Sequence, residues 1–363
     1  RVEPPCAYVA RCGGCNWMHI ARDSQPKFHA AIVENVVPDV WKSVPVVAHP
    51  SPGGSRTRAR IHVRVHRGHV AVGFFEARSH DPVEVDTCLA LHPSLDRARA
   101  ALKPLFEKAK GDGDAELALG KVEDDAIRKP VLDLKWNGEL PPTFYAALEK
   151  AVNAGVFQGA RVLVGESRSP AVVGDPTPWI PGADGAPLEL APGGFAQASE
   201  TGNVLLAKRV AELAKIALEG KEKPTLVELY AGAGNFTVLL ATLGAKVTAV
   251  ESHAGACAAS QKNLVARGLA AKVTVGDAAT YAIPNGTTLV VLDPPRTGAK
   301  EACETLVRAK AKKVVYVSCD PATFGRDLGI LERGGYTLDS IETFEMFPDT
   351  AHVETVALLT RTK

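Results

Sequence analysis

Two side chains in the last part of the chain have the chemistry of a covalent catalyst. Cys319 follows a β-rich run, where a cysteine is a candidate nucleophile, although a small buried side chain is the commoner role for a single cysteine. Glu354 interrupts an otherwise apolar run, where a carboxylate is costly unless it is paired or used. Burial would raise the pKa of this acid towards that of a working general base.

Glycines and acids at the ends of other β-rich runs suit a nucleoside ligand. Gly232 and Gly234 allow a tight turn where backbone approaches a ligand closely. Glu251 ends the next run and can hold a ribose diol, and Asp277 ends the third and can accept from an adenine amino group. Thr237 stands where a dinucleotide site has its third glycine, so the pattern favours S-adenosylmethionine over NAD. The structural alternative is that both acids only cap helices.

A fourth β-rich run ends in Asp293, followed by two prolines and Arg296. The prolines stiffen this loop and remove two amide donors. Such a loop can present Asp293 and backbone carbonyls to a flat base beside a methyl donor. The alternative is an ordinary strand that ends at a proline.

Three cysteines crowd together near the start of the sequence. Cys6, Cys12 and Cys15 form a C-x5-C-x2-C motif, and Cys88 follows far downstream. Seven cysteines in all, with no run typical of a secretion signal, indicate a reducing, cytoplasmic compartment rather than a disulfide framework. Four thiolates bind zinc or an iron–sulfur cluster, and the spacing alone does not decide between the two.

One predicted strand carries a basic face. Cations stand at every second position, with mostly apolar residues between them: Arg56, Arg58, Arg60, His62, Arg64 and His66. This period of two predicts a strand with one packed face and one basic face. A solvated face is the plain interpretation, and contact with nucleic-acid phosphates is the functional one.

The elements that must position these residues follow a regular order. From Thr225 onwards, short β-rich runs alternate with helical stretches, which predicts a parallel sheet with helices on both faces. The last two runs, 338–345 and 352–360, read as a hairpin. Residues 174–194 hold ten Gly or Pro and predict a long loop, after which 198–218 reads as a helix. Ligands of open α/β sheets bind at the carboxyl ends of the strands, where the candidate residues stand.

Length and composition are those of an ordinary globular protein. The 363 residues suggest two domains at about 150 residues each. Lys and Arg number 42 against 41 acids, and the net charge of +1 excludes a strongly basic nucleic-acid coat but permits a local basic face. A hydrophobic share of 46% excludes a disordered chain, and no apolar run reaches the roughly 18 residues that cross a bilayer.

Four motifs together resemble a known family. ELYAGAGNF, LDPPRTG, VSCDPATFGRDL and FPDTAHVE are similar, in content and order, to motifs of the uridine-C5 RNA methyltransferases. CGGC followed by His19 and a lone later cysteine resembles the branch that methylates 23S rRNA and carries an iron–sulfur cluster. Two positions depart from the family, since Asp320 and Ser199 stand where asparagine is usual.

The resemblance implies a role for each candidate residue. Cys319 would add to uridine C6 as the nucleophile, and Glu354 would remove the C5 proton as the general base. A [4Fe–4S] cluster would be held by Cys6, Cys12, Cys15 and Cys88. S-adenosyl-L-methionine would be bound by Gln197, Tyr230, Gly232, Gly234, Asn235, Glu251, Asp277 and Asp293.

The resemblance also implies an architecture and a partner. We expect an α/β fold: a Rossmann-like methyltransferase domain with a seven-stranded, mostly parallel sheet (18–50 and 191–363) and a smaller β-rich domain for the cluster and RNA (1–17 and 51–190). The partner would be RNA, with 23S rRNA favoured over tRNA, bound by a monomer that needs no membrane and no obligate protein partner. A DNA cytosine-C5 methyltransferase, an NAD dehydrogenase and a non-catalytic iron–sulfur RNA-binding protein are the less favoured alternatives.

Overall fold

A computed structural model describes residues 1–122, 128–167 and 169–362. The chain divides into two compact units. The first comprises 1–19, 53–181 and 189–200, and the second comprises 20–52, 182–188 and 201–363. The domain division predicted from the sequence has its boundaries at residues 17, 50 and 190. That these segments form two separate domains stays a prediction.

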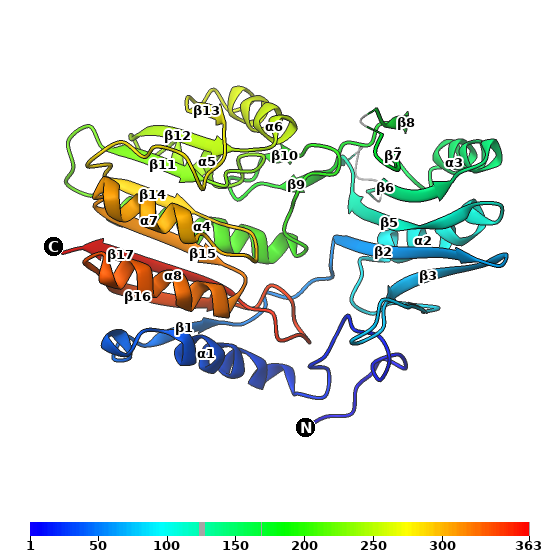
Figure 1. The fold of residues 1–363 in the computed structure, drawn as a ribbon, viewed down its shortest axis with the longest axis horizontal. Helices are drawn as coiled ribbons and strands as arrows, with labels where there is room; N and C mark the ends of the chain where they lie inside the picture. Colours follow the sequence, from blue (N-terminus) through cyan, green and yellow to red (C-terminus); the bar gives the residue numbers. More distant parts are fainter. Residues whose placement is uncertain (123–127, 168, 363) are drawn as a thin grey trace. The chain divides into compact units, whose positions relative to one another are not determined.

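The second unit is built on one large sheet (Figure 1). Its strands are β1 (Val46–His49), β11 (Thr225–Leu229), β12 (Lys246–Glu251), β13 (Lys272–Val275), β14 (Leu289–Leu292), β15 (Lys313–Ser318), β16 (Tyr336–Phe344) and β17 (Glu354–Arg361). Over the described residues their order is β1-β16-β17-β15-β14-β11-β12-β13. The strands pair in parallel except at β17, which is antiparallel to both of its neighbours, as the predicted hairpin requires.

The prediction of a seven-stranded sheet was wrong by one strand. The eighth strand is β1, which pairs in parallel with β16 at the edge of the sheet, with Val46 opposite Ile341. Its four residues are too few to show a period in the sequence, so only the pairing with a distant strand identifies it.

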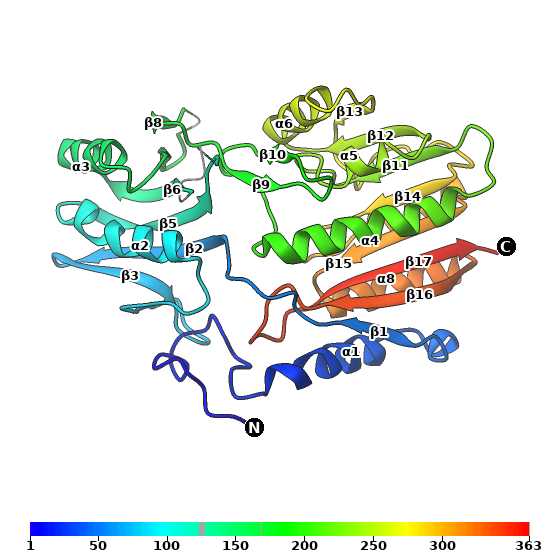
Figure 2. The same ribbon diagram turned by 180° about the vertical axis from the view of Figure 1, so that it is seen from behind.

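Helices cover both faces of this sheet (Figures 1 and 2). They are α1 (Gln25–Val36), α4 (Glu200–Leu218), α5 (Thr237–Leu240), α6 (Ala254–Val265), α7 (Lys300–Ala309) and α8 (Pro321–Arg333). Successive side chains of a strand point to opposite faces. In β14, Val290 and Leu292 therefore join the core under α1, α7 and α8, while Leu289 and Val291 join the core under α4 and α5.

The strand order places one crevice at the carboxyl ends. After β11 the chain runs outward through β12 and β13, and then returns to the other side of β11 as β14. Such a reversal of direction is where open α/β sheets bind ligands. The loops after β11 and β14 meet there, and they carry the glycine turn and Asp293.

The first unit is a mostly antiparallel sheet with two helices and a core of its own. The sheet order is β4-β3-β2-β5-β6-β7-β8 over the described residues. The strands are β2 (Arg58–His66), β3 (His69–Phe75), β4 (Pro82–Glu84), β5 (Lys110–Leu119), β6 (Pro130–Glu139), β7 (Gly159–Val164) and β8 (Ala171–Gly174). Helices α2 (Pro93–Leu102) and α3 (Pro142–Asn153) pack on it around Phe106, Trp136 and Phe144.

The remaining elements are short. Residues 174–194, predicted as a long loop, contain β9 (Trp179–Pro181) and β10 (Pro187–Glu189). Single 3-10 turns are η1 (Arg22–Ser24), η2 (Asp39–Trp41) and η3 (Lys103–Phe106). In the part of the chain that the structure describes, no helix combines the length and the apolarity that a bilayer crossing needs.

Candidate active site

The predicted nucleophile and base are neighbours across one strand pair. Cys319 follows the last residue of β15, and Glu354 is the first residue of β17. These strands are antiparallel, with Ser318 opposite Thr355. Cys319 comes directly after Ser318, and Glu354 comes directly before Thr355, so these two residues also lie opposite each other. The fold therefore brings together two side chains that were predicted separately.

Glu354 is a buried acid with unused hydrogen-bonding capacity. The residue is 2% exposed. Within the described part of the chain, its Oε2 atom has no hydrogen-bond partner. Burial raises the pKa of the carboxyl, the charge of Asp293 raises it further, and Arg296 opposes both. A buried oxygen without a partner is costly in a folded protein, which favours a carboxyl kept for a ligand.

Cys319 is a half-buried thiol surrounded by charge. Burial, followed by the charges of Glu354 and Asp293, raises its pKa to about 12, and Arg296 acts in the opposite sense. The thiol is therefore protonated at neutral pH when the site is empty. The charge of Arg296 therefore acts on both Cys319 and Glu354. Arg296 was not predicted as a site residue, although it stands directly after the two prolines that end the β14 segment.

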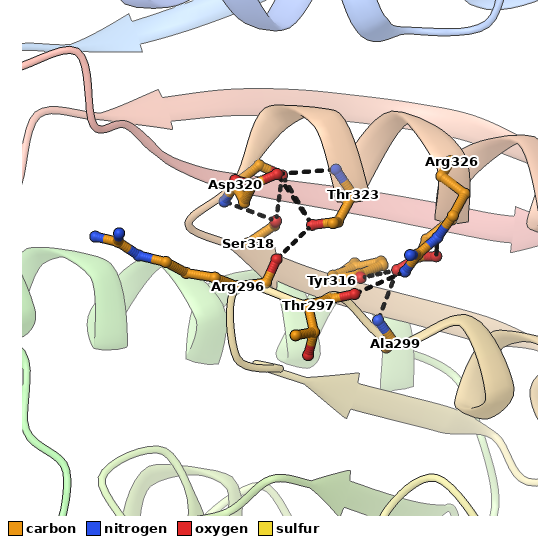
Figure 3. Close-up of polar contacts among 9 residues, drawn as sticks. Arg296, Thr297, Ala299, Tyr316, Ser318, Asp320, Thr323 and Arg326 are labelled. Carbon is orange, nitrogen blue, oxygen red and sulfur yellow. Dashed lines mark hydrogen bonds and ion pairs between the residues drawn. The ribbon is translucent and has the colours of Figure 1, made fainter. Parts of the chain in front are cut away.

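The loop that carries Asp293 and Arg296 is fastened to the start of α8 (Figure 3). Thr323 Oγ1 donates to the Arg296 carbonyl at 3.0 Å, and Arg326 Nη2 donates to the Thr297 carbonyl at 2.9 Å. The Arg296 side chain extends away from these contacts (Figure 3). Because α8 begins two residues after Cys319, the loop and the predicted nucleophile are held by the same helix.

A buried carboxylate completes this attachment. Asp327 is fully buried in α8 and accepts from the Tyr316 hydroxyl at 2.6 Å and from the Ala299 amide at 2.7 Å. Arg326 Nε donates to its other oxygen at 2.8 Å. Bonds to an ionised acceptor are the stronger kind, so the end of the loop is well fixed.

The departure at Asp320 has a structural explanation. Asp320 is the N-cap of α8, and its Oδ1 atom accepts from the Thr323 amide at 2.9 Å. Asparagine offers the same acceptor, and both residues are good N-caps. The exchange therefore preserves the helix start beside the nucleophile.

The turn after β11 has the predicted glycine geometry. Gly234 has a φ of +88°, and a Cβ atom there would lie 2.6 Å from Ser260 Oγ, so a side chain would be strained and crowded. Gly232 also has a positive φ, of +55°. Tyr230 has a φ of +62°, which is uncommon for a residue other than glycine. Burial raises its pKa to about 12, followed by the charge of Asp277.

The two strand-end acids bond to backbone amides, but neither is the cap of a described helix, since the N-cap of α6 is His253. Glu251 accepts from the Gly232 amide at 3.0 Å and from the His253 amide at 2.7 Å, one bond to each oxygen. Asp277 is exposed and accepts from the Ala279 amide at 2.9 Å. A carboxylate has about four lone-pair sites, so each acid can still accept from a ligand.

Two buried contacts beside the turn were not foreseen. Asn235, a predicted cofactor residue, exchanges two hydrogen bonds with Asn203 of α4, at 3.0 and 2.8 Å. Glu228 accepts from Thr237 Oγ1 at 2.6 Å. Burial raises the pKa of Glu228 to about 8, and the charges of Asp293 and Glu251 add to the rise. No spacing in the sequence identifies Asn203, because its partner lies in a different element.

Gln197 and Ser199 belong to the first unit, and both are buried there. The role of Gln197 in cofactor binding stays a prediction, and so does any effect of the departure at Ser199.

Arg56 joins the two segments that carry the predicted cluster cysteines. Cys6, Cys12 and Cys15 lie in the N-terminal segment, and Cys88 lies in the second. Arg56 Nη2 donates to the Gly14 carbonyl at 3.2 Å and lies 3.9 Å from Cys15 Sγ. Its backbone bonds to Ala90 and His92, which follow Cys88. The charge of Arg56 acts on both Cys12 and Cys88, although burial raises the pKa of each thiol.

Further contacts hold the N-terminal cysteine segment in place. Tyr8 donates its hydroxyl proton to Asp86 Oδ2 at 2.7 Å, and the Gly13 amide donates to the Phe75 carbonyl at 2.9 Å. Among the described residues, no three His, Cys, Asp or Glu side chains are grouped as ligands of one metal ion. Within the described residues none of the four thiols forms a disulfide, and each is partly exposed.

The predicted basic strand is β2, but its cations have acidic partners. Glu116 of β5 accepts from Arg58 at 2.6 Å and from Arg60 at 2.7 Å. Asp114 of the same strand pairs with His62 at 2.6 Å. The face is therefore largely neutralised within the sheet. The predicted phosphate contact stays a prediction, with the 58% exposed side chain of Arg60 as its strongest remaining candidate.

Sequence comparison connects this geometry to known enzymes. A profile of the tRNA (uracil-5-)-methyltransferase family matches residues 281–362, which hold Asp293, Cys319 and Glu354. The 23S rRNA (uracil(1939)-C(5))-methyltransferase RlmD of Pseudomonas putida is 34% identical over 390 residues, covering 99% of this chain and 80% of the relative. The RlmD of Pseudomonas entomophila is 33% identical over 386 residues, with coverages of 99% and 80%.

Structural comparison agrees. The tRNA (uracil-54, C5)-methyltransferase of Pyrococcus abyssi, solved in complex with S-adenosyl-L-homocysteine, matches with a TM-score of 0.73 at 25% identity. The match covers 96% of this chain and 86% of the other. The agreement extends over nearly the whole chain and includes the segment with the paired thiol and carboxyl. The chain therefore belongs to the family of S-adenosylmethionine-dependent RNA (uracil-C5)-methyltransferases.

Proposed function

We propose that this enzyme methylates a uridine of 23S rRNA through a covalent adduct between Cys319 and uridine C6. The observation that carries the mechanism is the pairing of Cys319 with Glu354, a buried acid that keeps one oxygen without a partner among the described residues. A nucleophile and a base are what methylation of uracil C5 requires, since that carbon is a poor nucleophile until C6 carries an added group.

The reaction balances with these two residues. The Cys319 thiolate adds to C6, and the electron pair of the C5–C6 double bond moves onto C5 and O4. S-adenosylmethionine supplies the methyl group that C5 then takes up. Glu354 removes the C5 proton, the electron pair of that C–H bond restores the double bond, and the C6–sulfur bond breaks to return the thiolate. Arg296 favours this sequence because its charge lowers the pKa of both Cys319 and Glu354.

The cofactor residues keep the roles that the sequence predicts. The turn with Gly232 and Gly234 would admit the donor close to backbone, with Tyr230 and Asn235 beside it. Glu251 would hold the ribose, and Asp277 the adenine amino group. Asp293 would stand near the positive sulfonium, whose charge would offset the burial that raises the pKa of this carboxyl. Gln197 is the remaining residue predicted to bind S-adenosylmethionine.

The choice of 23S rRNA as the substrate rests on the names of the relatives. The RlmD relatives that cover nearly the whole chain are named for 23S rRNA, which favours ribosomal RNA. The solved neighbour is named for tRNA, which makes tRNA the second candidate. Methyl transfer from labelled S-adenosylmethionine to RNA lacking 5-methyluridine, followed by size fractionation, tests the choice. We expect label in 23S rRNA; label confined to tRNA would overturn the substrate and leave the chemistry intact.

We also propose that Cys6, Cys12, Cys15 and Cys88 hold a [4Fe–4S] cluster. The two cysteine segments are joined through Arg56, and the Ala90 and Leu91 amides are directed at Cys88, as amides are around cluster sulfur. The thiolates of a four-iron cluster stand further apart than the ligands of one ion, so the absence of a single-ion group among the described residues is compatible with this assignment. The cluster would supply a structural link between the two segments.

Replacing Cys88 by serine tests the cluster. The variant is expected to lose most of its iron and its iron–sulfur absorbance, and to melt at a lower temperature, because metal binding of this kind contributes directly to folding. Cys257→Ser is the matched control, since Cys257 is buried in α6 of the other unit. Zinc in place of iron in the anaerobically purified wild-type protein would contradict the assignment.

A further inference from the structure

The connection that leads to Glu354 is anchored by an element from the other end of the sequence. Residues 345–353 link β16 to β17, and Asp349 lies in this loop, buried. The side chain of Gln25, the first residue of α1, is fully buried against it. Gln25 and Asp349 are 324 positions apart, so this contact is purely tertiary.

The contact between Gln25 and Asp349 is reciprocal. The Asp349 amide donates to Gln25 Oε1 at 2.8 Å, and Gln25 Nε2 donates back to Asp349 Oδ1 at 3.2 Å. Gln25 Nε2 also donates to the Ile20 carbonyl at 3.0 Å, which fixes the orientation of the amide group. One side chain therefore fixes both the backbone and the side chain of Asp349.

Two neighbours of Gln25 extend the anchor. Arg22 Nη2 donates to Asp349 Oδ2 at 2.7 Å. His29 Nε2 lies 2.9 Å from the carbonyl oxygen of Thr350. The three residues of this N-terminal segment thus contact two successive residues of the loop.

The loop needs such an anchor because its backbone is strained. Asp349 has a φ of +66°, in the left-handed region that residues other than glycine rarely adopt. Conformations of this kind persist only where surrounding contacts hold them, and they gather at functional sites. Without Gln25 the Asp349 amide loses its acceptor, and relaxation of Asp349 to a negative φ would redirect the chain towards Glu354.

Glu354 depends on this loop more than the other residues of β17 do. It is the first residue of its strand: the ladder to β15 begins only at Thr355, so Glu354 is paired on one side alone, with Phe344 of β16. We propose that Gln25, with Arg22 and His29, is a positioning residue for Glu354: it touches no reactant, and it sets the loop that orients the general base. This inference rests on the proposed role of Glu354.

A positioning role has a signature that a general structural role lacks. Glu354 acts after the methyl group has been transferred, when the C5 proton leaves. A misplaced base therefore slows the breaking of the C5–H bond and leaves earlier steps nearly unchanged. A partly unfolded enzyme would lose all steps together.

The test compares Gln25→Leu with wild-type enzyme on RNA that carries hydrogen or deuterium at C5 of the target uridine. We expect turnover to fall roughly 10- to 100-fold, the scale of a displacement of about 1 Å at a catalytic group. The deuterium isotope effect on turnover should rise, and a denaturation-resistant protein–RNA adduct should accumulate. The rate of the first methyl transfer, measured in a single turnover, should change less than about twofold.

Three further variants make the outcome decisive. Gln25→Glu keeps an acceptor for the Asp349 amide but faces the Asp349 carboxylate, so it should give the same result with less loss of packing. Gln261→Leu, an exposed position of α6, controls for the substitution itself. Glu354→Gln shows the isotope effect and the amount of adduct that result from complete loss of the base. If it gives neither adduct nor isotope effect, the proposed role of Glu354 as the base for the C5 proton fails; if it gives both while the Gln25 variants give an unchanged isotope effect and no adduct, the positioning role fails.

Discussion

Replacing Cys319 by alanine is expected to abolish methyl transfer. Removal of a covalent nucleophile lowers turnover on the order of 10⁴-fold or more, because no other group replaces the missing bond to the substrate. The adjacent strand pair places this thiol, and no other, beside Glu354 within the described residues. Transfer of labelled methyl groups to 23S rRNA, with melting of both proteins followed in parallel, measures the effect.

Cys303→Ala is the matched control for this prediction. Cys303 is a free thiol of the same unit, buried in the core beneath α7. Its replacement removes a small buried group and is expected to lower stability modestly while methyl transfer persists. Retained activity in Cys319→Ala would contradict the covalent mechanism, whereas loss in both variants would point to general damage.

The pH dependence of methyl transfer by the wild-type enzyme also tests the roles of Cys319 and Glu354. The pKa of Cys319 is raised to about 12 and that of Glu354 is also raised, so both groups are mainly protonated at neutral pH in the empty site. The reaction needs both in their ionised forms. The rate should therefore increase between about pH 6 and about pH 9. A rate that falls over this range would contradict the assigned roles.

Local sequence patterns singled out the two candidate catalytic residues because both break a local rule. Glu354 is an acid in an apolar run, and Cys319 ends a run of buried residues, so each stood out without knowledge of the fold. The alternation of β-rich and helical runs then predicted a sheet whose strand ends converge, and the structure brings Cys319, Glu354 and Asp293 together there. The roles of these residues were added by the family resemblance.

Contacts between distant segments could not be predicted. The cations of β2 were visible in the sequence, but the acids that neutralise them, Glu116 and Asp114, depend on the register between β2 and β5. The pairing of β1 with β16 and the contact of Gln25 with Asp349 likewise join opposite ends of the chain. Periodicity reports on neighbours along one element, so it carries no information about which elements meet.

Replacing Glu354 by glutamine is expected to stop the reaction after the methyl group has been transferred. Glutamine has nearly the same shape and keeps an acceptor oxygen, but it cannot take the C5 proton. Loss of a general base lowers turnover roughly 10²- to 10⁴-fold. The bond between Cys319 and C6 cannot break until that proton leaves, so the methylated adduct should accumulate. Denaturing electrophoresis with labelled methyl groups would detect it as one labelled protein–RNA band.

A second glutamate of the same region separates loss of the base from loss of any buried acid. Glu345 is also buried, and it accepts from the Ser51 amide at 2.9 Å, a bond that glutamine can keep. Glu345→Gln should therefore turn over without accumulating adduct. If Glu354→Gln bound donor and RNA yet transferred no methyl group even once, Glu354 would act before the transfer. Its carboxylate would then be the group that receives the Cys319 proton, as its place opposite Cys319 across the strand pair permits.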